Sequence, residues 1–342
     1  MRRFLAFFLG ISVFLTGCVA DNVEVKRKQY TATFLDLFDT VTNITGYADS
    51  EEEFHEKAQE IHDSLQTYHQ LFDIYHDYEG VANLKTVNDQ AGIAPVKVEN
   101  ILIRFLKDCK TYYETTGGRV NVAMGSVLAL WHDARSRGRD DPANARLPED
   151  DKLKEADKHT DINALVIDED ASTVYIADPQ MSLDVGAIAK GWAANEVSEN
   201  APEGLLISVG GNVCATGAKD ENGTPWVVGI QNPDDPEKYL HTIEVTDECV
   251  VTSGDYQRTY MVDGKLYHHI IDPETLYPGT YWRSVTIVCR DSGAADALST
   301  ALFIMSKEEG QSLLEKYDAE ALWVDRNGDI QYSPGFKKLI RT

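Results

Sequence analysis

Basic residues are scarce in this 342-residue sequence, which has 32 Lys and Arg against 56 Asp and Glu and a formal net charge of −24 at pH 7. A protein that binds nucleic acid needs clustered Lys and Arg to displace counterions from the phosphates. The shortage therefore excludes nucleic acid as the partner. An anionic substrate would also be weakly repelled by the protein as a whole. Any phosphate-binding site must rely on cations placed locally.

Cysteine is also scarce, and its spacing is irregular. The sequence has five cysteines, and no two of them form a Cys-X-X-Cys pair. Structural zinc sites and disulfide-rich scaffolds both need closely spaced cysteines. We therefore predict no structural zinc. The question of a disulfide stays open for the cysteines that follow Cys18, which are Cys109, Cys214, Cys249 and Cys289.

A long apolar run is lacking except near the N-terminus. There Arg2 and Arg3 precede a short apolar stretch, which is the pattern of a secretory signal peptide rather than of a membrane span. The Leu-Thr-Gly-Cys motif of residues 15–18 resembles a bacterial lipobox. The resemblance implies cleavage before Cys18 and a lipid on its sulfur. The alternative is an ordinary signal peptide followed by an unrelated cysteine.

The lipobox predicts both the organisation and the location of the chain. Residues 1–17 form the signal peptide, residues 18–29 the lipidated N-terminus and tether, and residues 30–342 the folded domain. Two or three acyl chains hold a protein durably at a membrane. We therefore expect an extracytoplasmic protein that is lipid-anchored to the bacterial cell membrane. Loss of Arg2 and Arg3 with the signal changes the net charge from −24 to −26.

The full sequence has 43% hydrophobic and 9% aromatic residues, which suits a folded enzyme-sized protein. Partial alternation over residues 29–48 predicts a strand or hairpin, and the charged segment 134–160 reads as an exposed excursion. Apolar residues at helical spacing predict helices over residues 50–73, 98–118, 187–199, 293–305 and 307–317. Strands and helices without regular βαβ alternation favour an α+β fold in one large domain.

The segment MSLDVGAIAKGWAANEVSE, residues 181–199, reads as a short strand, a turn and a helix. The start of such a helix offers unpaired N–H groups and the positive end of a dipole, which suit a phosphate. Lys190 lies in the first turn, where the dipole disfavours a cation unless an anion lies nearby. The alternative is that Gly186 and Gly191 serve tight packing and that Lys190 is a solvated surface residue.

The segment DSGAADALSTALFIMS, residues 291–306, predicts a helix on which Asp296 and Thr300 share a face. A carboxylate and a hydroxyl on one face form half of an all-oxygen site of the kind that magnesium prefers. The alternative is that Asp296 complements the helix dipole while Thr300 bonds to its own backbone.

The segment YHHIIDPETLYPG, residues 267–279, places two adjacent histidines before an Asp-Pro turn. If the histidines extend a strand, their side chains point to opposite faces, so only one of His268 and His269 serves a given site. Imidazole titrates near neutral pH and is suited to proton transfer. The alternative is that both histidines are purely structural.

Six motifs in order resemble the ApbE-type flavin transferases, FAD:protein FMN transferases. They are LDVGAIAKGWA, SVGGN, WVVGIQNP, TSGDYQR, YHHIIDPETLYP and ADALSTALFIMS, and the resemblance extends from about residue 30 to the C-terminus. It implies a lipid-anchored, Mg²⁺-dependent enzyme with an ApbE-like, T-fold-like α+β fold and FAD in a central cleft. Such an enzyme breaks the FAD pyrophosphate, joins FMN through a phosphoester to a Thr or Ser of a target protein, and releases AMP.

The resemblance also implies roles for particular residues. The metal ligands would be the carbonyl of Ala187 with Asp296 and Thr300, and His269 would be the base, oriented by Asp272. The implied FAD contacts are Phe38, Tyr75, Met124, Gly125, Ser126, Asp184, Lys190 and Ile270.

The chain departs from the family pattern at two positions. Leu276 stands where a turn glycine is usual, and a positive φ there would cost a leucine about 1 kcal/mol or more. Phe38 and Asp39 replace a Met-Gly pair that is common before the following Thr.

Two other functions use the same residues. A surface lipoprotein that binds flavin without turnover needs the pocket but has little use for Asp296 and Thr300. An FAD pyrophosphatase that yields FMN and AMP shares every residue and differs only in using water as the acceptor.

Overall fold

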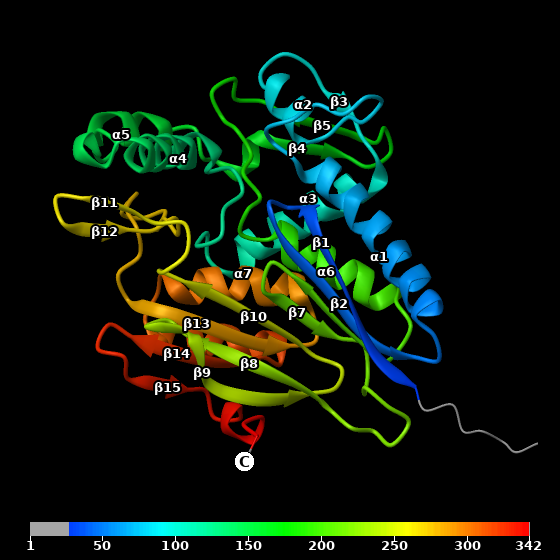
Figure 1. Cartoon of the computed structure of the whole chain (residues 1–342). Coiled ribbons are helices and arrows are strands. Elements are labelled where there is room, and N and C mark those ends of the chain that lie inside the picture. Colours follow the sequence, from blue (N-terminus) through cyan, green and yellow to red (C-terminus); the bar gives the residue numbers. More distant parts are fainter. Residues whose placement is uncertain (1–26, 342) are drawn as a thin grey trace, which may run out of the picture.

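The computed structural model describes residues 27–341, and an open, eight-stranded antiparallel sheet runs through it (Figure 1). The predicted signal peptide and Cys18 lie outside the described residues. In spatial order the strands are β1 (Lys28–Leu37), β2 (Thr40–Ala48), β6 (Leu205–Val209), β7 (Asn212–Ala215), β10 (Cys249–Gly254), β13 (Trp282–Cys289), β14 (Glu320–Asp325) and β15 (Ile330–Tyr332).

Both faces of this sheet are covered. On one face lie α1 (Glu51–Phe72), α6 (Ala189–Asn200) and α7 (Ser292–Phe303), with α6 packed against α7 and α7 against β10 and β13. On the other face lies the hairpin of β8 (Trp226–Asn232) and β9 (Asp235–Val245). Side chains that alternate along β10 enter the two cores in turn, because successive residues of a strand point to opposite faces.

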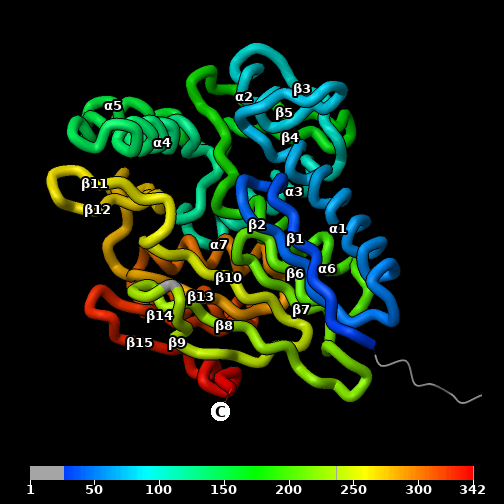
Figure 2. Tube along the Cα trace, in the orientation of Figure 1, coloured from blue at the N-terminus to red at the C-terminus, as the bar shows by residue number. Residues whose placement is uncertain are grey.

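Two smaller parts complete the fold (Figure 2). One contains a three-stranded sheet with two helices. Its elements are α2 (Leu84–Asp89), β3 (Val96–Lys97), α3 (Asn100–Thr115), β4 (Leu165–Asp168) and β5 (Thr173–Ile176). The other has a core of its own and lies beside the main sheet. Its elements are α4 (Gly125–Asp140), α5 (Asp150–Asp157), β11 (Tyr260–Val262) and β12 (Lys265–Tyr267).

The predicted α+β fold is confirmed, and so are the predicted helices. The segments 50–73, 98–118, 187–199 and 293–305 correspond to α1, α3, α6 and α7, and α8 (Lys307–Leu314) continues into a short 3₁₀ turn. The hairpin expected over residues 29–48 is β1–β2. The segment 134–160 is mostly exposed, as expected, but it is largely helical and buries Ala134 and Leu153, which the sequence did not predict. Its dense charge lies on the outer sides of short helices.

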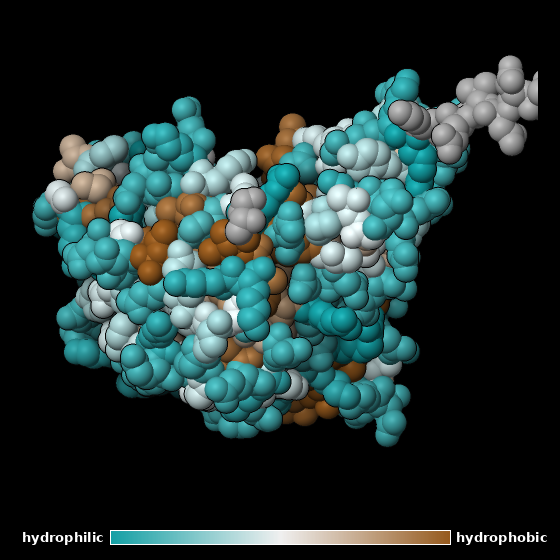
Figure 3. Space-filling view, turned by 90° about the horizontal axis from the view of Figure 1, so that it is seen from below, coloured by the Kyte–Doolittle hydropathy of each residue, from teal (hydrophilic) through white to brown (hydrophobic). Residues whose placement is uncertain are grey.

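The surface agrees with the composition. Seen from below, most of the molecule is hydrophilic, and apolar side chains appear in separate patches (Figure 3). Within the part of the chain that the structure describes, no helix is long and apolar enough to cross a membrane.

Two backbone positions are unusual. Phe38 and Asp39 form the two-residue β1–β2 loop with φ values of 53° and 51°, so the loop has the positive φ values of a type I′ turn without the usual Asn-Gly pair. Leu276 has a φ of 61°, and its side chain is buried in the core that contains Trp131. The indole Nε1 of Trp131 donates to the carbonyl oxygen of Leu276 over 2.9 Å, which holds this turn in place.

Substitutions of Leu276 can separate the free-energy cost of its positive φ from the stability gained by burying its side chain. Leu276→Ala and Leu276→Gly both remove the buried side chain, but only glycine adopts a positive φ without strain. We expect both variants to be less stable than the parent, with the glycine variant more stable than the alanine variant by about 1 kcal/mol. Urea unfolding of the three proteins measures the difference. An alanine variant as stable as the glycine variant would contradict strain at this position.

Candidate active site

A single cavity of about 760 Å³ brings together ten of the residues implied by the resemblance. They are Phe38, Tyr75, Met124, Asp184, Ala187, Lys190, His269, Ile270, Asp296 and Thr300. The volume falls within the range of sites for small molecules and cofactors. The walls come from segments far apart in the sequence, including the β1–β2 loop, the loop after α1, the starts of α4 and α6, and α7.

Asp296 is the most deeply buried acid of this cavity, with 5% of its surface exposed. Its Oδ2 accepts hydrogen bonds from the backbone N–H of Gly191, over 2.8 Å, and from Nδ2 of Asn212, over 3.0 Å. Burial raises the pKa of this carboxyl, while the charge of Lys190 acts in the opposite direction. Among residues 27–341, no hydrogen bond reaches Oδ1, so this oxygen is left for a ligand.

Gly191 permits this arrangement because it has no side chain. A Cβ atom at this position would lie 2.4 Å from the Cβ of Asp296 and 2.4 Å from the carbonyl oxygen of Ser292. The glycine thus lets α6 approach α7 closely enough for its N–H to reach the carboxylate. The packing role and the functional role of this glycine coincide.

The contacts of α7 argue against a purely structural role for Asp296 and Thr300. The N-cap is Asp291, whose side chain accepts from the N–H of Ala294, so Asp296 is not needed to cap the helix. Thr300 lies one turn further along and lines the same cavity, and no hydrogen bond of its hydroxyl to the backbone is present in the described chain. Both side chains are therefore available to the cavity.

The oxygen donors of this corner fit a small, hard cation. Asp296 supplies a carboxylate, Thr300 a hydroxyl and Ala187 a backbone carbonyl, all lining one cavity. Mg²⁺ is usually held by one or two carboxylates, with waters and substrate phosphates completing the shell. Among the described residues, no cluster of three or more His, Cys, Asp or Glu able to hold a metal occurs.

Four cations line the cavity, and one of them, Arg119, pairs with Asp272 and Glu274, while of the other three only Lys190 was predicted. Arg135 and Arg258 were missed. Neither of them forms an ion pair with a carboxylate anywhere in residues 27–341, and Arg258 has a φ of 47°. The charge of Arg258 lowers the pKa of Arg135, after the larger effect of burial, which shows that the two guanidinium groups act on one another. Unpaired cations in a cavity of an acidic protein provide the local attraction that an anionic ligand needs.

The two histidines have different surroundings. β12 ends at Tyr267, so the predicted strand does not reach them, but only one of the two lines the cavity, as predicted. His268 is buried, its Nε2 lies 2.9 Å from the carbonyl oxygen of Gly279, and its Nδ1 accepts from the N–H of Ile270. His269 lines the cavity, and its buried Nδ1 has no hydrogen-bond partner in the described structure.

Burial and nearby cations keep His269 from titrating near neutral pH. Burial is the main cause that lowers its pKa to about 3, and the positive charge of Arg258 acts in the same direction, followed by smaller contributions from His268, Arg135 and Lys190. The ring is therefore neutral throughout the physiological range. A neutral imidazole accepts a proton, and an anionic ligand beside the arginines would offset their effect on its pKa.

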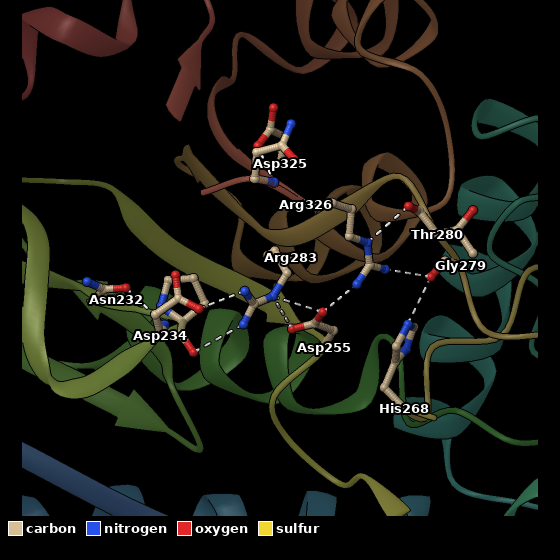
Figure 4. Close-up of polar contacts among 11 residues, drawn as sticks. Asn232, Asp234, Asp255, His268, Gly279, Thr280, Arg283, Asp325 and Arg326 are labelled. Atoms are coloured by element: carbon tan, nitrogen blue, oxygen red, sulfur yellow. Dashed lines mark hydrogen bonds and ion pairs between the residues drawn. The ribbon is translucent and has the colours of Figure 1, made fainter. Parts of the chain in front are cut away.

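His268 belongs to a chain of polar contacts that fixes this part of the cavity wall (Figure 4). The buried carboxylate of Asp255 accepts from Nε of Arg283 over 3.1 Å and from Nη1 of Arg326 over 2.6 Å. Nη2 of Arg326 donates over 3.0 Å to the same Gly279 carbonyl that His268 contacts. Asp255 thus connects the TSGDYQR segment to the backbone that presents His269.

Three implied residues lie outside the cavity lining. Asp272 accepts from Nη1 of Arg119, over 3.4 Å, and from the N–H of Glu274, over 2.9 Å. In the described chain no hydrogen bond joins Asp272 to His269, so Asp272 shapes the turn rather than orienting the ring of His269. Gly125 and Ser126 bond to the 180–182 segment, through Gly125 N–H to the carbonyl of Ser182 and Ser126 Oγ to that of Gln180.

Fold and cavity together define the class: an α+β protein whose central cavity offers unpaired cations and a buried carboxylate to a nucleotide-sized anionic ligand. The sequence comparison is consistent with this description. Residues 38–323 match the sequence model described as the ApbE family. This chain therefore belongs to the ApbE family.

Relatives and solved structures of similar sequence span most of the chain. It is 35% identical over 277 residues to the FAD:protein FMN transferase of Treponema pallidum (strain Nichols), covering 75% of each chain. It is 30% identical over 251 residues to that of Klebsiella pneumoniae (strain 342), covering 71% of this chain and 75% of the relative. The crystal structure of the ApbE protein of Thermotoga maritima matches with a TM-score of 0.80 at 28% identity, covering 92% of this chain and all of the other.

Proposed function

We propose that this protein transfers FMN from FAD to a Thr or Ser hydroxyl of another protein. The acceptor oxygen forms a bond to the phosphorus on the FMN side of the pyrophosphate, the bond from that phosphorus to the bridging oxygen breaks, and AMP leaves. The observation that carries the proposal is the placement of the buried Asp296 carboxylate in one cavity with His269 and unpaired cations. The relatives that share the fold are named for this reaction.

The cations of the cavity bind the substrate where the protein as a whole repels it. Lys190 and Arg258 lie in the same cavity as Asp296, and their charges act on its carboxyl, so both are near the corner that would receive the pyrophosphate. Phe38 and Tyr75 present aromatic rings to the cavity, and Tyr75 is also near the ring of His132, with centroids 5.8 Å apart. These rings offer stacking surfaces to the isoalloxazine or the adenine.

Mg²⁺ would be held by Asp296, Thr300 and the carbonyl of Ala187. When bound, the ion neutralises charge that develops on the phosphoryl oxygens and on the departing AMP. Asn212 and Gly191 position the carboxylate for this role by occupying Oδ2.

His269 takes the proton of the acceptor hydroxyl. Its imidazole is neutral in the free protein and lines the cavity, so the ring can accept a proton there. Phosphates that neutralise Arg258 and Arg135 would raise the pKa of His269. Binding of FAD thus makes this residue a better base.

Two alternatives are separated by the acceptor. A flavin-binding lipoprotein without turnover gives no reason for a buried carboxylate with one oxygen left unbonded. An FAD pyrophosphatase uses the same residues with water as the acceptor, so only the product distinguishes it from a transferase.

The transfer is tested by intact-mass analysis of a candidate acceptor incubated with the protein, FAD and Mg²⁺. We expect the acceptor to gain the mass of an FMN phosphoester, EDTA to stop the reaction and Mg²⁺ to restore it. Asp296→Asn keeps the side-chain volume and removes the charge, and it should lower transfer by about 100-fold or more. The control is Asp133→Asn, an exposed residue of α4. Release of FMN and AMP without modified acceptor would identify a pyrophosphatase instead.

The base is tested with His269→Gln, which should keep FAD binding and lose transfer rate by roughly 10² to 10⁴. His268→Gln should lose less, because His268 holds the backbone and does not line the cavity. Because the free enzyme already has neutral His269, kcat/KM should stay flat from pH 5 to 8 and fall only as the pH approaches 3. A midpoint near 6.5 that disappears in His269→Gln would show that the cavity does not lower this pKa.

We also propose that the protein is anchored outside the cytoplasm by a lipid on Cys18. The support is the order of basic residues, apolar stretch and Leu-Thr-Gly-Cys motif in residues 1–18. Cys18→Ala should move the protein from the membrane fraction to the soluble or unprocessed fraction and abolish labelling by a radioactive fatty acid. Labelling that persists in the variant would refute lipidation at this residue.

A further inference from the structure

Three buried thiols lie side by side on neighbouring strands, beneath α6 and α7. Cys249 of β10 is the register partner of Cys214 on β7 and of Cys289 on β13. All three belong to the core on the helix-covered face, and the Sγ atoms of Cys214 and Cys249 lie 2.6 Å apart. The structure holds these cysteines as free thiols. The proposed reaction uses none of them.

The sheet register favours a bond between Cys214 and Cys249. The N–H of Ala215 donates to the carbonyl of Glu248 over 3.0 Å, so that neighbouring pair is the hydrogen-bonded one. Pairs alternate along an antiparallel ladder, and Cys214 and Cys249 are therefore a non-hydrogen-bonded pair. Such pairs have Cα atoms about 4.5 Å apart and side chains that approach closely, which lies within the range for a disulfide.

Cys249 and Cys289 form a register pair of the other kind, in which the side chains approach less closely. The N–H and C=O of one residue in a strand point to the same side, so those of Cys249 face β13 and make its pair with Cys289 hydrogen-bonded. The N–H of Asp255, which donates to the carbonyl of Arg283 over 2.9 Å, fixes the same alternation from the other end of the strands. The thiol of Cys289 instead donates to the carbonyl of Asp291 over 3.2 Å.

We propose that Cys214 and Cys249 form a disulfide when the domain folds in an oxidising compartment. The oxidant is a small-molecule or protein disulfide. A thiolate of one cysteine displaces one sulfur of the oxidant, and the second cysteine then resolves the mixed disulfide. Two electrons and the two thiol protons pass to the oxidant, which leaves in its reduced form, as two thiol groups. Because both sulfurs are buried in the folded domain, the exchange occurs before the core closes. In the cell this requires the extracytoplasmic location proposed above.

The bond would link β7 and β10, two strands that lie beneath the active site. Cys214 is two residues along β7 from Asn212, which donates to Asp296, and β10 carries Ser253 and Gly254 into the cavity lining. The bond would also close the loop that contains β8 and β9, which restricts the unfolded chain. Its expected effects are a fixed strand pair beneath the site and a more stable fold.

Peptide mapping tests the assignment. The full chain is refolded from urea in a mixture of oxidised and reduced glutathione, alkylated under denaturing conditions and digested with trypsin. Lys219, Lys238 and Arg258 separate the three cysteines into different peptides. We expect a linked Cys214–Cys249 peptide, lighter by two hydrogen atoms than its parts, and alkylated Cys289.

The matched variants are Cys289→Ser, which should keep the linked peptide, and Cys214→Ser, which should lose it. Reduction should lower the urea midpoint by about 1 M in the parent and in Cys289→Ser but not in Cys214→Ser. Complete alkylation of Cys214 and Cys249 in the parent, or a linked peptide that contains Cys289, would overturn the proposal. The readouts are mass and stability, so they are independent of whether the protein transfers FMN.

Discussion

The hydrogen bonds to one oxygen of Asp296 organise the whole site. They join α7, which carries the carboxylate, to the backbone of α6 through Gly191 and to β7 through Asn212. A carboxylate with 5% exposure is costly to bury unless its charge is met by donors and cations. The two helices must therefore cross closely, and this crossing places Thr300, Lys190 and the carbonyl of Ala187 in the same cavity.

The electrostatics of the protein work on two scales. The chain carries a net charge of −24, yet the cavity gathers Lys190, Arg135 and Arg258 without a partner carboxylate on either arginine in the described chain. These charges and burial keep His269 neutral in the free protein. The same cations therefore attract an anionic substrate and keep His269, the proposed base, in its neutral form. Elsewhere, as at Asp255, arginines pair with acids and serve the framework.

Sequence patterns located the parts of the site that depend on local geometry. Asp296 and Thr300 are four residues apart on one helix, and Lys190 lies in the first turn of another, where the helix dipole disfavours a cation. Each feature belongs to a single helix, so it could be recognised without knowing the fold. Arg135 and Arg258 could not, because their lack of partners is visible only once the chain is folded. The strand expected at His268 and His269 ends one residue before them. The two rings differ in their surroundings, because His268 contacts the carbonyl of Gly279 whereas His269 lines the cavity. The α4 segment was missed because its apolar residues serve a small separate core.

The β1–β2 loop shows where the protein gives up stability for function. Phe38 and Asp39 both have positive φ, a conformation that suits glycine or asparagine better, and the N–H of Phe38 is held by Nδ1 of His69 over 3.1 Å. The Phe38 ring meets the His69 ring edge-on and lines the cavity. Selection for thermal stability alone would thus favour replacements at this loop that remove an aromatic wall of the site. Engineering of this enzyme for robustness should leave residue 38 untouched and look for gains away from the cavity.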